Sequence, residues 1–236
     1  SWIDQMAAGK AFVRQKAGYE NIYYAPKNIS DKINEWLDGK LFLYNNDYGS
    51  NWDQLYEKIV EIIREKKIKL LMIDNLMALD FDESDQNARE TRFIKQFKDL
   101  CKRENIHGIL VCHPRKEQSF QLLRKESIAG TANLTNLCDN LIISHRVGND
   151  FEKRAKDFFG AAKVAEFMSF DVVLEIVKNR SIGVTDYLIG LYYEPETRRI
   201  KNDIAENLIF GWQEEPIQTE FEQPALTTDD DDDLPF

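Results

Sequence analysis

The feature that most constrains the fold is an alternation of amphipathic and apolar segments between residues 51 and 112. Residues 51–67 place apolar side chains on one face at helical spacing, and a continuous apolar strand at 68–73 follows directly. The same pair then recurs, with an amphipathic helix predicted over 81–105 and a strand over 107–112. Helices alternating with buried strands are typical of a parallel sheet with helical crossovers, so we expect an α/β fold.

The pattern changes after residue 113, where the elements become shorter and more polar. The last two predicted strands are joined by a short polar segment, which predicts an antiparallel hairpin at the sheet edge. In chain order we expect a polar, basic loop at 114–127, a short helix at 132–137, a strand at 140–144, a charged helical stretch at 150–167, and strands at 171–178 and 186–193.

The acidic charge is concentrated at one end of the chain. The formal net charge is -10 at pH 7, but nine of the 41 acidic residues lie in 213–236, which has no Lys or Arg. The rest of the chain carries 32 acidic against 31 basic residues, so net acidity does not exclude a nucleic-acid partner. We expect one folded domain at 1–212 and a disordered acidic tail at 213–236, because one-signed charge with low hydrophobicity does not support a core.

Cysteine usage and hydropathy favour a cytoplasmic protein. The sequence has no close CxxC pair and no histidine at zinc-ligand spacing, so we interpret its cysteines as reduced packing residues. No apolar run reaches the roughly 18 residues that a membrane span needs, and the first ten residues lack the layout of a secretory signal. We therefore expect no membrane partner. The cysteines are Cys101, Cys112 and Cys138.

Asp74 ends the first predicted strand and His113 follows the second. The carboxyl ends of parallel strands share one edge of the sheet, which is where nucleotides bind in such folds. An aspartate there can hold Mg²⁺, and a nearby histidine can hydrogen-bond a γ-phosphate. Alternatively, Asp74 only caps a loop and His113 is an ordinary loop residue.

A nucleotide site of this kind also needs a phosphate cradle, G-x-x-x-x-G-K-[ST]. In the one candidate, at 7–11, Ala11 stands where a hydroxyl is needed and Asp4 stands in place of the first glycine. Either the protein is not an NTPase, or the sequence begins after its phosphate loop.

Two groups of basic residues complete the candidate chemistry. The loop after His113 places four cations within eleven residues, which suits contact with a phosphate backbone without sequence readout, although a solvated basic loop is the competing interpretation. Lys178 and Arg180 are two positions apart near a strand end and project to the same side. An arginine so placed can stabilise transition-state charge on a phosphate held by another subunit, although K-x-R is also common on exposed strands. The loop cations are Arg115, Lys116, Arg124 and Lys125.

Taken together, these segments resemble a known family. Their order and intervals are similar to those of the RecA-type helicase domain of ring-shaped DnaB-family replicative helicases, above all phage primase-helicases and mitochondrial Twinkle. The resemblance spans roughly residues 30–200 and implies a RecA-like, largely parallel sheet with flanking helices, incomplete at the N-terminus, and an antiparallel C-terminal hairpin. The motifs that carry it are IDN at 73–75, CHPRKE at 112–117, SIAGTANLTNLCDNLII at 127–143 and VKNRSIG at 177–183.

The resemblance implies a nucleotide site shared between subunits. Asp74 resembles the Walker B aspartate that binds Mg²⁺, and Asn75 lies beside it. Arg180 resembles a trans-acting arginine finger, with Lys178 as its companion at the same γ-phosphate. The cofactors implied are ATP, or another NTP, and Mg²⁺.

The resemblance also implies a connection from phosphate to DNA. His113 resembles the phosphate-sensing residue, and Asn136 falls where some members have a polar relay residue. The loop that follows His113 resembles the central-channel loop that grips single-stranded DNA. Its implied DNA contacts are Arg115, Lys116, Arg124, Lys125, Gly130 and Thr131.

The expected function is therefore that of the C-terminal part of a hexameric ATP-dependent replicative helicase that moves on single-stranded DNA and unwinds duplex. Two departures matter: Asp186 replaces a glycine of the family pattern, and the phosphate loop and the next strand with its catalytic glutamate are missing. We expect a piece of a longer protein, inactive alone. The alternatives are a RecA/RadA-type recombination ATPase or a circadian-clock-type ATPase of the same fold, and a non-catalytic replication adaptor.

The C-terminal sequence DDDDDLPF resembles the tip of bacterial single-stranded-DNA-binding proteins. A terminal aromatic residue and its carboxylate can enter an apolar pocket with a basic rim, while aspartates speed the encounter. We expect replication proteins as partners of the tail. The alternatives are a solubilising tail, or one that covers the basic loop when DNA is absent. The implied contacts are Asp233, Leu234, Pro235 and Phe236.

Overall fold

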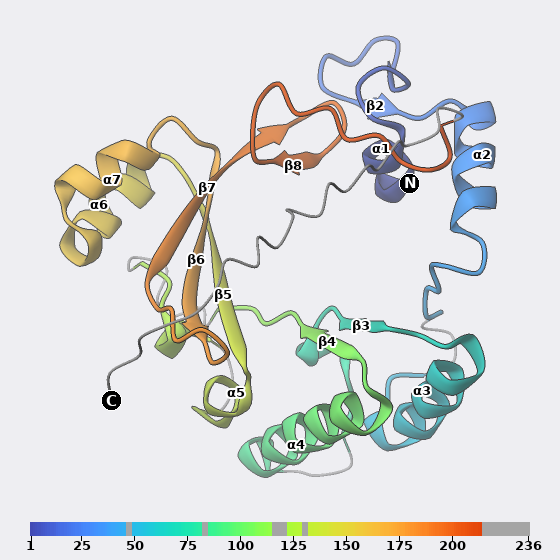
Figure 1. Ribbon diagram of the computed structural model, residues 1–236, viewed down its shortest axis with the longest axis vertical. Coiled ribbons are helices and arrows are strands. Elements are labelled where there is room, and N and C mark those ends of the chain that lie inside the picture. The colour runs from blue at the N-terminus through green and yellow to red at the C-terminus, as the bar shows by residue number, and fades with distance from the viewer. Residues whose placement is uncertain (46–48, 82–84, 115–121, 129–131, 214–236) are drawn as a thin grey trace, which may run out of the picture.

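A computed structural model describes residues 1–45, 49–81, 85–114, 122–128 and 132–213 (Figure 1). The helices are α1 (Trp2–Ala8), α2 (Lys27–Leu37), α3 (Trp52–Lys66), α4 (Gln86–Glu104), α5 (Ala132–Leu137), α6 (Asn149–Phe159) and α7 (Ala161–Phe167), with 3-10 turns η2 (Leu76–Ala78) and η4 (Lys125–Ser127). The strands are β1 (Arg14–Gln15), β2 (Tyr23–Tyr24), β3 (Leu70–Ile73), β4 (His107–Leu110), β5 (Asn140–Arg146), β6 (Val172–Asn179), β7 (Tyr187–Glu194) and β8 (Arg199–Lys201).

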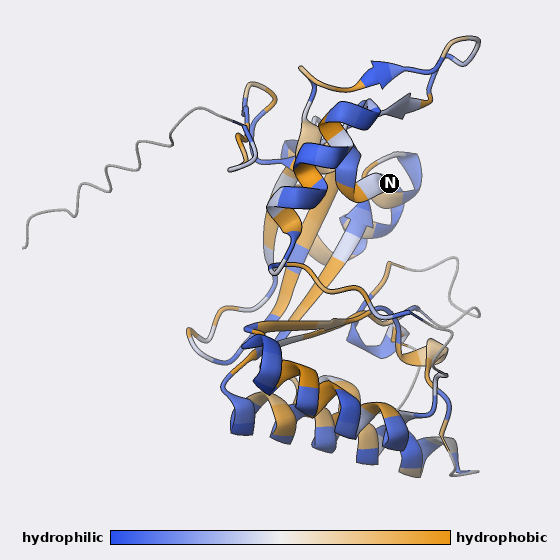
Figure 2. Ribbon diagram, turned by 90° about the vertical axis from the view of Figure 1, so that its right-hand side faces the viewer, coloured by the Kyte–Doolittle hydropathy of each residue, from blue (hydrophilic) through white to orange (hydrophobic). Residues whose placement is uncertain are grey.

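The predicted alternation of helix and strand is present as α3, β3, α4 and β4. β3 and β4 pair in parallel, from Leu70 opposite His107 to Ile73 opposite Leu110. Each helix is bounded by local chemistry: Asn51 and Asp85 cap the N-termini with their side chains, and α3 ends at Lys67 in the left-handed conformation. In Figure 2 these two long helices, at the bottom, alternate hydrophilic and hydrophobic residues along their length.

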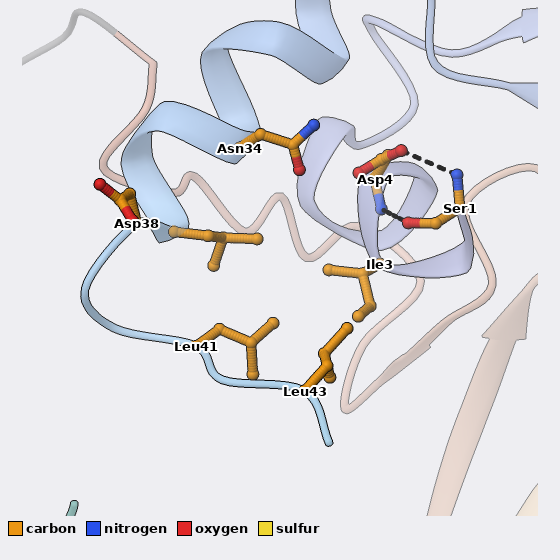
Figure 3. A pocket seen from close by; sticks show the side chains of 8 residues that line it. Ser1, Ile3, Asp4, Asn34, Asp38, Leu41 and Leu43 are labelled. Atoms are coloured by element: carbon orange, nitrogen blue, oxygen red, sulfur yellow. Dashed lines mark hydrogen bonds and ion pairs between the residues drawn. The ribbon is translucent and has the colours of Figure 1, made fainter. Parts of the chain in front are cut away.

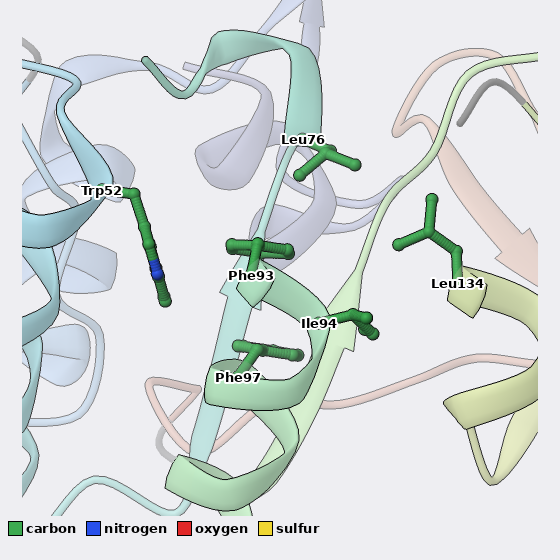
Figure 4. Packing of buried hydrophobic residues seen from close by; sticks show 6 residues of the cluster. All are labelled: Trp52, Leu76, Phe93, Ile94, Phe97 and Leu134. Carbon is green, nitrogen blue, oxygen red and sulfur yellow. The ribbon is translucent and has the colours of Figure 1, made fainter. Parts of the chain in front are cut away.

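The first core lies between this pair of helices and one face of the parallel strands (Figure 4). Trp52 on α3 and Phe93 on α4 are fully buried with ring centroids 4.6 Å apart, and Phe97 stacks on Phe93 at 5.8 Å. Burial of each such side chain contributes about 1.5–3 kcal/mol. The core therefore fixes where β3 and β4 end.

The opposite face of β3 and β4 is uncovered within the described residues. Leu70 and Met72 are 53% and 55% exposed, and Ile109 is 37% exposed. Their neighbours Leu71 and Ile73 pack against the first core. Parallel sheets normally have both faces buried, so this apolar face is of the kind that packs against further polypeptide.

The larger sheet has the order β5-β6-β7-β8 and is antiparallel throughout. The predicted hairpin of β6 and β7 is confirmed. The sheet is less parallel than expected, since β5 pairs with β6 and the parallel pairing among the described strands is confined to β3 and β4. Helices α6 and α7 pack on this sheet over a second core that includes Phe151, Val164 and Val173.

The terminal regions form a third cluster that the sequence pattern did not predict. The Arg199 guanidinium on β8 donates to the carbonyls of Met6 and Leu208, at 2.6 and 2.9 Å, and Trp212 Nε1 donates to Ala7 O at 2.9 Å. The chain up to residue 213 is thus still ordered where periodicity is lost after Pro195. The tail at 214–236 lies outside the described residues.

Two sequence expectations concern absences. The three cysteines are free and partly buried, and burial raises the pKa of the Cys112 thiol to about 11. Within the part of the chain that the structure describes, no helix has the length and apolar character of a membrane span.

Candidate functional site

The carboxyl ends of β3 and β4 meet through a side-chain hydrogen bond. Asn75 follows β3 by two residues, and its Nδ2 lies 2.8 Å from Nε2 of His113, which follows β4. Oδ1 of Asn75 accepts the backbone N–H of Met77 at 2.9 Å, where it caps η2. The carboxamide is therefore held at both ends, and the parallel pairing brings the two strand ends together.

Asp74 is exposed at this edge, directly before Asn75. Within the described residues no group of three or more His, Cys, Asp or Glu side chains is arranged to hold a metal ion by itself. Mg²⁺ commonly binds one or two carboxylates and completes its shell with water and substrate phosphates. A single exposed aspartate fits that mode of binding, with the phosphates supplied by the nucleotide.

Lys178 and Arg180 lie together at the C-terminal end of α5. Lys178 Nζ donates to the carbonyls of Thr135 and Asn136 at 2.9 and 3.1 Å, and Arg180 donates to Asn136 O at 2.8 Å. These are unpaired carbonyls of a helix end, which favours cations. Asn136 thus takes part through its backbone, while its side chain is exposed. A register shift in the β5–β6 ladder beside Lys178 locally alters the strand.

Asp139 and Lys98 complete this cluster. Asp139 Oδ1 accepts from Lys98 at 2.9 Å and from Arg180 at 3.1 Å. These contacts, the Lys98 hydrogen bond first, lower the pKa of the Asp139 carboxyl. Three cations therefore share a single carboxylate and several helix-end carbonyls, and Arg180 remains half exposed. We refer to Lys98, Lys178 and Arg180 as the α5 cation cluster.

The basic loop is placed differently from the simple expectation of four DNA contacts. Arg124 forms an ion pair with Glu175 on β6, and its second guanidinium nitrogen lies 3.2 Å from Asp186 Oδ1. Lys125 is exposed, with its amine 3.7 Å from Glu126. Of the two cations, only Lys125 projects to the surface. The remaining expected DNA contacts, Arg115, Lys116, Gly130 and Thr131, lie outside the described residues, as do Asp233, Leu234, Pro235 and Phe236 of the tail.

The segment 7–11 does not act as a phosphate cradle. The Lys10 amine pairs with Glu196 at 3.0 Å, and a Cβ at Gly9 would meet the Arg199 guanidinium at 2.8 Å. The segment is occupied by contacts within the third cluster.

A separate cavity of about 240 Å³ lies near α1 and α2, away from these strand ends (Figure 3). Ile3, Leu41 and Leu43 point into it, and Asp4 is paired with the Ser1 amine at 2.7 Å. None of the expected site residues lines it. The candidate chemistry therefore lies at the strand ends and the α5 cation cluster.

Several residues of the site were not expected from the sequence. Lys98 and Asp139 hold Arg180, and Glu175 with His145 holds Arg124. Glu175 had a signal, because it is a lone carboxylate in the apolar strand DVVLEIVK, a pattern that predicts a buried and paired acid. Lys98 had none, since its partners are about 40 residues away in the chain.

Comparisons with known proteins agree with this geometry. Residues 30–119 match the family model described as "AAA domain". The structure is similar to a solved helicase ATPase domain, with a TM-score of 0.60, 14% identity, and coverage of 85% of this chain and 68% of that one. It is also similar to "The Structure Of A DnaB-Like Replicative Helicase And Its Interactions With Primase", with a TM-score of 0.59, 14% identity, and coverage of 85% and 46%.

No curated protein matches the chain significantly in sequence. The chain spans about two thirds of the first structure and less than half of the second. The resemblance to the DnaB-type domain is thus confirmed at the level of the fold. The chain has the RecA-like α/β fold of the ATPase domains of DnaB-like replicative helicases, and its residues 30–119 carry the sequence pattern of an AAA domain.

Proposed function

We propose that this chain is the C-terminal part of the motor domain of a DnaB-family replicative helicase, related to phage primase-helicases and Twinkle. In this proposal it assembles into a homo-hexameric ring, binds ATP and Mg²⁺ between neighbouring subunits, and moves along single-stranded DNA. The observation that carries the proposal is the hydrogen bond between Asn75 and His113, because it places an exposed aspartate and a histidine at one edge of a parallel pair in a RecA-like fold.

Each residue has a distinct task in the proposed reaction. Asp74 holds Mg²⁺, which neutralises charge on the phosphates when ATP is bound. His113, oriented by Asn75, hydrogen-bonds the γ-phosphate and loses that bond when phosphate leaves. The loop after His113 begins one residue later, so a movement of the imidazole is passed directly to it.

Lys178 and Arg180 act on the nucleotide of the neighbouring subunit. Their present bonds are to neutral carbonyls and one exposed carboxylate, which a triphosphate with its greater charge can replace. Arg180 then stabilises charge on the transferred phosphoryl group as an arginine finger, and Lys178 binds the same group as a point charge. Asn136 stays a backbone acceptor in the resting arrangement.

DNA contact in this proposal comes from Lys125 together with Arg115, Lys116, Gly130 and Thr131. The acidic tail recruits replication proteins through Asp233, Leu234, Pro235 and Phe236. We expect the protein in the cytoplasm of a bacterial or phage-infected cell. The uncovered apolar face of β3 and β4 is where we expect the polypeptide that carries the phosphate loop to pack.

The test is ATP hydrolysis and strand displacement by the full-length protein, with and without single-stranded DNA. The proposal expects DNA-stimulated hydrolysis and unwinding, both lost in Asp74→Asn. The 236 residues alone should hydrolyse no ATP. Strand pairing in place of unwinding would indicate a recombination ATPase. Neither activity, together with partner binding that depends on Phe236, would indicate an adaptor; either outcome overturns the proposal.

A further inference from the structure

The loop between β4 and β5 is held at its base by three contacts. An isolated antiparallel bridge joins Pro114 to Ile128, which closes the base. Leu122 is buried in the second core, against α6, α7 and β6. Ser127 is buried and binds Arg124 in both directions, with its hydroxyl accepting the Arg124 N–H at 3.0 Å. We refer to residues 122–128 as the loop root.

Arg124 makes the most heavily charged of these contacts. Its guanidinium pairs with Glu175, which is fully buried and also lies 2.8 Å from His145 Nε2. The same guanidinium lies 5.3 and 5.6 Å from the ring centroids of Phe158 and Phe159 on α6. A buried carboxylate is stable only when paired, so Glu175 commits Arg124 to the protein interior.

From this geometry we infer that Arg124 is a positioning residue that fixes the DNA loop to β6, and that it does not contact DNA phosphates itself. The inference rests on the proposed function for the word DNA alone, since the ion pair is a property of the chain. It also separates the two cations of this segment: Arg124 is directed inward and Lys125 outward.

The connection has a direction that matters for coupling. Glu175 lies three residues before Lys178 on β6, and Arg180 follows the end of the strand. Arg124 therefore ties the loop root to the strand that carries two members of the α5 cation cluster. His113 ties the opposite end of the loop to Asn75. Both ends of the loop are thus joined to residues of the proposed nucleotide chemistry.

The test compares Arg124→Ala, Arg124→Lys and Glu175→Gln, with Lys125→Ala as the matched control. Amide hydrogen exchange at 122–128 is measured on the protein without DNA, with exchange in α4 as the check of folding. Binding to oligo(dT) is then measured across a range of salt concentrations. The two readouts are independent, because exchange does not require that the protein bind DNA.

A positioning role predicts that exchange at the loop root rises about tenfold or more in all three Arg124 and Glu175 variants, with α4 unchanged. Lysine should not rescue, since a point charge does not reproduce two guanidinium contacts between aromatic rings. Oligo(dT) binding should weaken in Glu175→Gln even though that variant loses a negative charge. Lys125→Ala should leave exchange unchanged and lower the salt slope by about 0.7, as for one lost phosphate contact on a single strand.

Direct phosphate contact by Arg124 predicts the opposite: unchanged exchange, retained binding in Arg124→Lys, and equal or tighter binding in Glu175→Gln. That result overturns the inference. If Glu175→Gln unfolds α4 as well, Arg124→Lys decides by the same two readouts. A wild-type protein that does not bind oligo(dT) contradicts the proposed function, while exchange at 122–128 still decides whether Arg124 holds the loop root.

Discussion

The carboxamide of Asn75 fixes the tautomer of His113. Its oxygen accepts the Met77 N–H at 2.9 Å, so its nitrogen is the atom that faces His113 Nε2 at 2.8 Å. An amide nitrogen donates only, and Nε2 must therefore accept. The imidazole is neutral with its proton on Nδ1, and Nδ1–H is the donor left for a phosphate.

The tautomer can be measured directly by ¹⁵N NMR of the imidazole. We predict that His113 carries its proton on Nδ1 in the wild-type protein, and on Nε2 in Asn75→Asp, because a carboxylate accepts where the amide donated. His107, exposed at the other end of β4, is the matched control and should not change. Asn75→Ala should lower DNA-stimulated ATP hydrolysis about two- to tenfold, the worth of one neutral hydrogen bond. Unchanged imidazole shifts in Asn75→Asp would contradict the assignment.

Acid should loosen the α5 cation cluster. The pKa of Asp139 is lowered from its ordinary value of 3.8, first by Lys98, so its contribution to stability is present above that value and is lost as pH falls through the lowered value. Asp139→Asn should reduce stability by about 0.2–1 kcal/mol at pH 7, since the pairs are exposed. The difference from wild type should vanish in strong acid. Thermal unfolding from pH 2 to 7 measures this, with exposed Asp157→Asn as the control; a difference that persists in acid would refute the ion-pair explanation.

Gly108 on β4 is required by packing. A Cβ there would meet the Phe97 ring at 2.8 Å and also the Cys101 sulfur, both on α4. Gly108→Ala should therefore destabilise the protein by about 1–3 kcal/mol and displace the strand that ends at His113. Gly148 has open space around it and serves as the control, with an expected cost of a few tenths of a kcal/mol for alanine at a helix cap. Equal losses in urea unfolding would show that the close approach is unimportant.

Asp186 explains a departure from the family pattern. Its φ is 53°, in the left-handed region where glycine is favoured. Asp186→Gly and Asp186→Ala both remove the contact with Arg124, so their difference isolates the backbone. We predict that the alanine variant is less stable than the glycine variant by about 1–2 kcal/mol in denaturant unfolding. Equal stability of the two would mean that the turn adopts another conformation.

The sequence predicted local structure well and long-range side-chain pairing poorly. Helical and strand periodicity located α3, β3, α4, β4 and the β6–β7 hairpin, because those patterns are set by which face is buried. It did not predict that Arg124 turns inward, since the charge of a loop residue says nothing about a carboxylate 51 positions away. Arg199, buried among carbonyls, was missed for the same reason. β8 is too short to show a period of its own.

The pairing of β5 shows a further limit. Its apolar sequence fits either a parallel or an antiparallel neighbour, and its partner β6 lies about 30 residues later. Only the tertiary structure decides between them. The expected edge residues Asp74 and His113, by contrast, follow from strand order alone.

The central claim is that Arg180 acts on the nucleotide bound at Asp74 of a neighbouring subunit. Co-expression of Asp74→Asn and Arg180→Ala subunits tests it most directly, with Arg146→Ala, an exposed residue at the other end of β5, as the control. Each variant alone should lose DNA-stimulated ATP hydrolysis, by about 10³-fold or more for Arg180→Ala, with ATP still bound. Random mixed rings should regain up to about a quarter of wild-type hydrolysis, because that share of interfaces pairs an intact aspartate with an intact arginine. No recovery in mixed rings, or full activity of Arg180→Ala alone, would contradict the account.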